Sequence, residues 1–157
     1  MFELDEDITS QEPGLYVAAF FDEETNNNIA EYMRVNKIPS PVNTASLHTT
    51  IVYSKVPVPN FEPNHSVDIE VNTDHATFEC WDMRNGSRCL VLKYFSPYLH
   101  LRFEEAMKDG AMYDFDEYKP HFSLSYEMPL DFDASTLPPL GFPLRIVGEY
   151  SEPLIQD

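Results

Sequence analysis

The order of predicted elements repeats once along the chain, and this repeat constrains the fold more than any other feature. Each half reads as a strand, an amphipathic helix and then an apolar strand that carries a histidine, because hydrophobic periodicity changes from two to 3.6 and back. The elements span residues 14–21, 22–36 and 46–55 in the first half, and 88–95, 96–110 and 119–127 in the second. The halves share little sequence, so the repeat is architectural, and it predicts an α+β domain with two pseudo-symmetric lobes.

Local signals support both helices. Acidic residues fill the first turn of 22–36, and apolar residues follow at helical spacing. In the second helix, Ser96 is a candidate N-cap, Pro97 suits the first helical position, and Gly110 suits the end. Three further strands are expected at residues 65–72, 75–83 and 144–150.

Length and charge limit the possible functions. The 157 residues suit one domain, 1–157, with an acidic N-terminal lead at 1–13. No apolar run approaches the roughly 20 residues that cross a bilayer, and the N-terminus lacks the pattern of a signal peptide, so we expect a cytoplasmic protein without membrane contact. The net charge of −17 argues against a long nucleic-acid partner, because such binding needs many basic side chains.

A hairpin signal lies between the two cysteines. Asn85-Gly86 is flanked by strand-like residues and predicts a two-residue loop that pairs Arg84 with Ser87. Cys80 and Cys89 would then be diagonal neighbours on one face, about 7–8 Å apart. A disulfide needs Cβ atoms about 3.8 Å apart, so the pairing predicts two free thiols.

The two histidine strands share the pattern His-x-[Thr/Ser]-apolar. Strict alternation puts His48, Thr50 and Val52 on one face of the first strand and Leu47, Thr49, Ile51 and Tyr53 on the other. In the second strand it puts His121, Ser123 and Ser125 on one face and Phe122, Leu124 and Tyr126 on the other. A single strand histidine beside a hydroxyl is usually a satisfied polar residue. Two matched copies, each ending a strand–helix–strand unit, favour a catalytic site. The remaining histidines, which lack the pattern, are interpreted as structural or surface residues.

This chemistry suits cleavage of a phosphodiester by an adjacent 2′-hydroxyl. One histidine would take the proton of that hydroxyl and the other would protonate the departing 5′-oxygen, leaving a 2′,3′-cyclic phosphate that water opens to a 3′-phosphate. Thr50 and Ser123 would donate hydrogen bonds to the non-bridging oxygens. The sequence leaves open which histidine is the acid and which the base. Zinc sites commonly use three or more protein ligands, so the motifs predict no metal and no other cofactor.

The segments His48-Thr49-Thr50-Ile51 and His121-Phe122-Ser123-Leu124 resemble the twin signatures of the two-histidine (2H) phosphoesterases. With GLYVAAFF at 14–21, the flanking sequence resembles the bacteriophage anti-CBASS phosphodiesterases, which destroy the cyclic nucleotide signals of a bacterial immune pathway. The resemblance implies a bilobal fold with antiparallel sheets around a central cleft. It also implies a metal-independent enzyme that hydrolyses cyclic di- or trinucleotides such as 3′,3′-cyclic GMP–AMP in the host cytoplasm.

Other residues are candidates for the substrate pocket. Tyr16 and Trp81 could stack on a base, and Glu149 could accept hydrogen bonds from its amino group; the resemblance supports these roles. Alternatively, the two aromatics are core residues and the acid is an ordinary exposed one. Lys119 shares strand parity with His121 and could hold phosphate if the strand extends back through Pro120, a residue that strands disfavour.

Two other functions are considered. The same site could process RNA ends or cleave 2′,5′ linkages, although few basic residues favour a small substrate. A non-catalytic sponge for nucleotides or an acidic decoy would leave the paired histidines unexplained.

Overall fold

The computed structural model describes residues 12–115 and 117–155, so most of the predicted acidic lead, residues 1–11, lies outside the described part. Seven strands form two antiparallel sheets, one in the order β2-β1-β7-β3 and one in the order β4-β5-β6. The strands are β1 (Gly14–Phe21), β2 (His48–Ser54), β3 (Ile69–Val71), β4 (Thr77–Asp82), β5 (Arg88–Lys93), β6 (His121–Ser125) and β7 (Leu144–Leu154). The predicted α+β fold of two lobes is confirmed.

The helices are α2 (Glu23–Val35) and α3 (Pro97–Lys108), close to their predicted bounds. Ser96 caps α3 as predicted, because its hydroxyl accepts the Leu99 N–H. Gly110 follows the end of α3 with a positive φ of 105°, a conformation that glycine adopts without strain. Within the described residues no helix has the length and apolar character of a membrane span.

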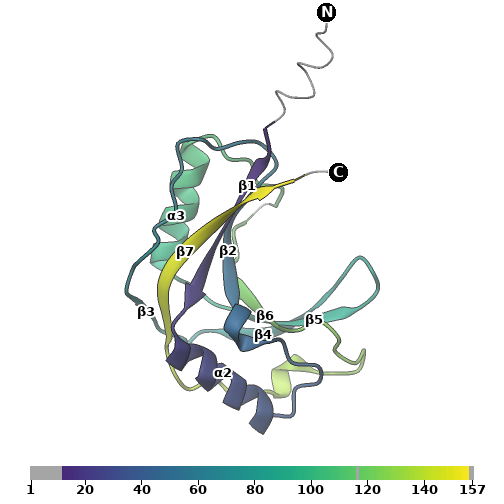
Figure 1. The fold of residues 1–157 in the computed structure, drawn as a ribbon. Helices are drawn as coiled ribbons and strands as arrows, with labels where there is room; N and C mark the ends of the chain where they lie inside the picture. The colour runs from purple at the N-terminus through teal and green to yellow at the C-terminus, as the bar shows by residue number, and fades with distance from the viewer. Residues whose placement is uncertain (1–11, 116, 156–157) are drawn as a thin grey trace, which may run out of the picture.

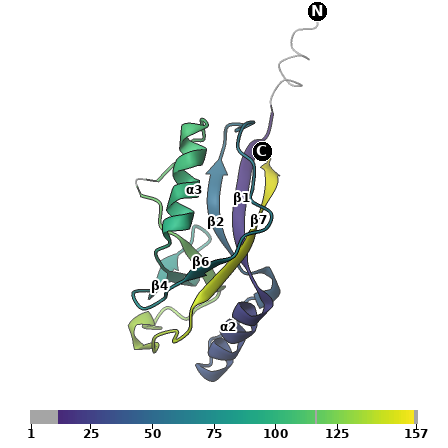
Figure 2. The same ribbon diagram turned by 90° about the vertical axis from the view of Figure 1, so that its left-hand side faces the viewer.

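Each helix covers the outer face of one sheet. In α3, Arg102 pairs with Glu149 of β7, on the face of the four-stranded sheet that lies away from the other sheet (Figure 1). In α2, the ring of Tyr32 stacks on Phe78 of β4 with the centroids 5.4 Å apart. The helix between β1 and β2 therefore packs on the three-stranded sheet, which does not contain these two strands. The helix between β5 and β6 packs in turn on the four-stranded sheet. The helices lie at opposite ends of the molecule (Figures 1 and 2).

A β-bulge interrupts each histidine strand at the same position of the motif. On β2, Val52 lies opposite Val17 and Thr50 opposite Ala18, so Ile51 is the extra residue. On β6, Leu124 is the extra residue by the same register shift. Each bulge reverses the alternation that follows it.

The bulges correct the predicted faces. Val52 is buried in the core and Tyr53 is exposed, whereas strict alternation predicts the reverse. Ser125 is likewise buried, where its hydroxyl donates to the Pro39 carbonyl at 2.7 Å, and Tyr126 is exposed. The predicted cleft faces are correct for the histidine and hydroxyl of each motif and wrong beyond them.

The β4–β5 hairpin differs from its predicted register by one residue. Gly86 donates to the Met83 carbonyl, and Met83 in turn donates to the Ser87 carbonyl, so the loop has three residues. Gly86 has a φ of 87°, as expected for a type I turn closed by a left-handed glycine. The shift places Cys89 opposite Trp81 and Cys80 opposite Leu90, on different faces of the sheet. Both thiols are free.

Candidate active site

The two histidine strands meet at the junction of the sheets. The start of β2 lies beside β6 (Figure 1). His48 from β2 and Ser123 from β6 line one cavity, together with Tyr126. His121 lines a neighbouring cavity with Trp81 and Lys119. Groups from both motifs thus face one cleft, although 73 residues separate the histidines.

The backbone holds both imidazoles in the same way. Nδ1 of His48 lies 2.9 Å from the carbonyl oxygen of Ser46, and Nδ1 of His121 lies 2.8 Å from that of Lys119. A carbonyl only accepts, so Nδ1 carries the hydrogen in both rings. Nε2 is therefore the nitrogen that each neutral imidazole offers to a ligand, and it can take up a proton.

A group on the adjacent strand contacts each motif hydroxyl. The Tyr16 hydroxyl lies 3.0 Å from Oγ1 of Thr50. The Cys89 thiol donates to Oγ of Ser123 across 3.3 Å. Burial raises the pKa of Tyr16 to about 12 and also raises the pKa of Cys89, so both groups stay protonated near neutral pH. When they donate, the hydrogens of Thr50 and Ser123 remain available to a ligand.

Two buried tyrosines of the second half bind the first motif strand. The Tyr118 hydroxyl donates to the Thr50 carbonyl across 2.7 Å. The Tyr94 hydroxyl lies 2.7 Å from Oγ1 of Thr49. Tyr118 also precedes Lys119, whose carbonyl holds the His121 ring. These contacts fix the two motifs relative to each other.

The two imidazoles have different surroundings. The centroid of the Trp81 ring lies 4.4 Å from that of His121, whereas Tyr16 presents its ring to His48 at 6.4 Å. Burial is the main cause that lowers the pKa of His121, and the nearby His48 adds to the effect. The neutral form of His121 is therefore favoured near neutral pH. Trp81 thus lies beside His121, and its stacking on a base stays a prediction.

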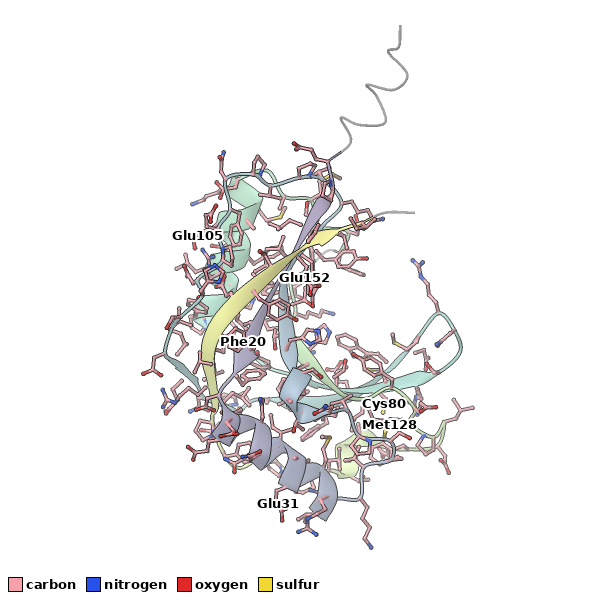
Figure 3. The ribbon with its side chains drawn as sticks, in the orientation of Figure 1. Phe20, Glu31, Cys80, Glu105, Met128 and Glu152 are labelled. Carbon is pink, nitrogen blue, oxygen red and sulfur yellow. The ribbon has the colours of Figure 1, made fainter. Side chains whose placement is uncertain are left out.

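The predicted role of Glu149 is wrong. Its side chain points to the α3 face of β7, is 1% exposed, and receives hydrogen bonds from Arg102 and Tyr98. Tyr150 and Glu152 lie opposite Ala18 and Tyr16 and so share the cleft face of the sheet. Figure 3 shows Glu152 on the opposite side of the sheet from α3, which carries Glu105. Side chains alternate between the two faces of β7, and the pairing with β1 shows which face is the cleft face. Together these two facts identify Glu152 as the acid that faces the cleft.

Lys119 precedes β6, which begins at His121. The carbonyl of Lys119 holds the His121 ring, and the exposed side chain of Lys119 borders the cavity beside Trp81. Pro120 thus marks the start of the strand. Nowhere in 12–115 and 117–155 do three or more His, Cys, Asp or Glu side chains gather in a group that could hold a metal ion.

The fold and the paired motif strands define the class of the molecule. The solved structure of E. coli LigT complexed with 3′-AMP superposes with a TM-score of 0.58 at 16% identity and covers 89% of this chain and 87% of that one. This likeness shows the two-histidine phosphoesterase fold, as the sequence predicts.

Sequence similarity identifies the family. The sequence model of the family described as "Anti-CBASS protein Acb1" matches residues 13–157. The anti-CBASS protein Acb1 of Enterobacteria phage T4 is 39% identical over 145 residues, which span 92% of this chain and 90% of that protein. That of Salmonella phage S16 is 38% identical over 142 residues, which span 90% of this chain and 88% of that protein. The chain belongs to the Acb1 family of anti-CBASS proteins, and the predicted resemblance is confirmed.

Proposed function

We propose that the protein is a phosphodiesterase that uses no metal and hydrolyses cyclic di- or trinucleotide messengers, such as 3′,3′-cyclic GMP–AMP, in the infected cell. One observation carries the proposal: a backbone carbonyl holds each imidazole through Nδ1, His48 lines a cavity with Ser123 of the other motif, and His121 lines the neighbouring cavity, close enough for His48 to lower its pKa. Membership of an anti-CBASS family and the phosphoesterase fold support it. Loss of the messenger would let a phage evade the immune response.

His121 is the general base of the first step. Nε2 of its neutral ring takes the proton of the 2′-hydroxyl, and the 2′-oxygen attacks the adjacent phosphorus. The bond from phosphorus to the 5′-oxygen breaks, and protonated His48 supplies the proton to this leaving oxygen. The immediate product is a linear molecule with a 2′,3′-cyclic phosphate. The exchanged protonation states then suit attack by water, which opens the cyclic phosphate to a 3′-phosphate and restores both rings.

Thr50 and Ser123 stabilise the negative charge that builds on the non-bridging oxygens. The Cys89 thiol donates to Ser123, and when the Tyr16 hydroxyl donates to Thr50, the hydrogens of Thr50 and Ser123 are both oriented before the substrate arrives. Such preorganised donors are worth more in a site shielded from water than in solution. Tyr16, Trp81 and Lys119 are proposed to contact the nucleotide around the phosphate.

Charge favours a small substrate. The chain carries 27 acidic residues against 10 Lys plus Arg, so a long RNA would meet a repulsive surface. An RNA-end or 2′,5′-phosphodiesterase activity predicts turnover of short linear substrates at comparable rates. A sponge predicts tight binding of the cyclic nucleotide without turnover.

The test uses the purified protein and 3′,3′-cyclic GMP–AMP in excess EDTA, with products resolved by chromatography and mass. His48→Ala/His121→Ala serves as the inactive partner, and His75→Ala, which alters a histidine outside the motifs, as the matched control. We expect linear product from the wild type and the control alone. Intact 3′,3′-cyclic GMP–AMP in every sample would exclude this nucleotide as a substrate. Binding without cleavage would favour the nucleotide sponge.

A further inference from the structure

The motif repeat extends two residues further than His-x-[Thr/Ser]-apolar. The segments HTTIVY and HFSLSY both end in tyrosine, at positions 53 and 126. The bulge at Ile51 or Leu124 comes after the hydroxyl residue and before this tyrosine in each strand. Both tyrosines are thereby turned to the face that carries the histidine and the hydroxyl.

Exposure follows the bulges closely. Tyr53 is 48% exposed and Tyr126 is 47% exposed, whereas the preceding residues, Val52 and Ser125, are buried. Tyr126 borders the cavity that His48 and Ser123 line. An exposed aromatic ring beside a catalytic pair gains nothing from core packing, so its position indicates a contact with a ligand.

Tyr53 has an equivalent place in the other lobe. It lies directly opposite Tyr16 on β1, with the rings edge to face at 6.3 Å. The Tyr16 hydroxyl contacts Thr50, and Tyr53 stands two residue pairs along the strand from this motif hydroxyl. Tyr126 thus shares a cavity with the hydroxyl residue of its own motif, and Tyr53 lies beside the tyrosine that contacts the hydroxyl of the other motif.

We propose that Tyr53 and Tyr126 are base-binding residues, one for the nucleoside on each side of the scissile phosphate. The inference rests on the proposed function. A phosphate held between Thr50 and Ser123 lies between the two motif strands, and a phosphodiester extends a nucleoside in both directions from it. Aromatic rings suit nucleobases of any sequence, because every base offers a flat π-face.

Binding is the direct readout, because it does not require turnover. Tyr53→Ala and Tyr126→Ala are made separately in the His48→Ala/His121→Ala background, and the Kd for 3′,3′-cyclic GMP–AMP is measured by calorimetry. Each change should raise Kd about 5- to 150-fold, which is the stacking energy of one base converted to a ratio. Tyr→Phe at either position should retain the affinity. Tyr→Leu replaces any alanine variant that fails to fold, since it keeps apolar bulk and removes the flat ring.

Phe95→Ala is the matched control, since this ring is 63% exposed and packs on His100 rather than in the cleft. Its Kd should equal that of the background. Unchanged Kd values for both tyrosine-to-alanine variants, or losses in the phenylalanine variants as large as in alanine, would overturn the proposal.

A ligand with a single nucleoside separates this inference from the proposed function. With adenosine 2′,3′-cyclic phosphate, one of the two alanine variants should lose affinity and the other should not. Equal losses in both would contradict the assignment of one nucleoside to each tyrosine. If the wild type binds the cyclic dinucleotide but never cleaves it, the proposed function fails while the binding data still decide the roles of the tyrosines.

Discussion

The strands β2 and β6 have the same local backbone structure but different neighbouring side chains. Both begin with a histidine whose Nδ1 is held by the carbonyl two residues earlier, and both carry a bulge after the hydroxyl residue. They differ in what contacts them: Trp81 packs on His121, a phenol reaches Thr50, and a thiol reaches Ser123. The backbone therefore places two histidines in equivalent positions, and we propose that the neighbouring side chains give each of them its own role in catalysis.

The largest expected effect comes from removing either imidazole. His48→Ala and His121→Ala should each lower kcat about a hundred- to ten-thousandfold, because acid and base act in the same step. Steady-state kinetics on 3′,3′-cyclic GMP–AMP measures both losses. A variant that keeps the wild-type kcat would show that the substituted histidine takes no part in the mechanism. The two strands would then not be equivalent in function.

The hydroxyls should follow with smaller losses. Thr50→Val and Ser123→Ala each remove one donor to the developing charge, a change worth about a hundred- to a thousandfold in kcat in comparable sites. The effect should fall on kcat more than on KM, since the charge appears in the transition state. Losses confined to KM would instead assign these hydroxyls to ground-state binding.

The groups behind the hydroxyls should matter less. Tyr16→Phe and Cys89→Ala each remove one neutral hydrogen bond, so we expect losses in kcat of about two- to tenfold, smaller for the weakly donating thiol. Cys89→Ser should restore activity because its hydroxyl also donates. Cys80→Ala, which alters the free thiol on the other face of the sheet, is the control. Equal rates in the Cys80 and Cys89 variants would deny Cys89 an orienting role.

The smallest effect concerns pH. Because burial lowers the pKa of His121, its neutral form persists below the ordinary value of about 6.5, and activity should fall only as the pH drops below that value. Trp81→Ala exposes the ring to water, so the acidic limb of kcat/KM should move to higher pH. A limb that stays in place would show that another group controls it.

The sequence predicts those features that rest on strong local signals. The strand at 14–21, both helices with the Ser96 cap, and the cleft-facing pairs of each motif agree with the structure. Features that change when a strand or loop contains one extra residue do not agree with the structure. A bulge leaves no mark in an alternating pattern, so strict alternation puts Tyr53 and Tyr126 on the face opposite the histidines, whereas the structure has both on the histidine face.

The hairpin register and Glu149 show the same limit. Asn85-Gly86 suits a two-residue loop and also a three-residue loop with glycine in the left-handed position, and backbone geometry decides between them. Glu149 lies in β7, where polar and apolar residues follow each other without strict alternation. Its buried partner, Arg102, comes from a helix 47 residues away, a contact that no local pattern reveals.

The central claim is that the substrate's own 2′-oxygen, and not water, attacks the phosphorus. The direct test is a time course of 3′,3′-cyclic GMP–AMP cleavage in water enriched in heavy oxygen, with each product weighed by mass spectrometry. The two-histidine mechanism predicts that the earliest linear product is a 2′,3′-cyclic phosphate without label, followed by a 3′-phosphate that contains one labelled oxygen. A labelled linear phosphate from the earliest time, with no cyclic phosphate before it, would contradict the mechanism.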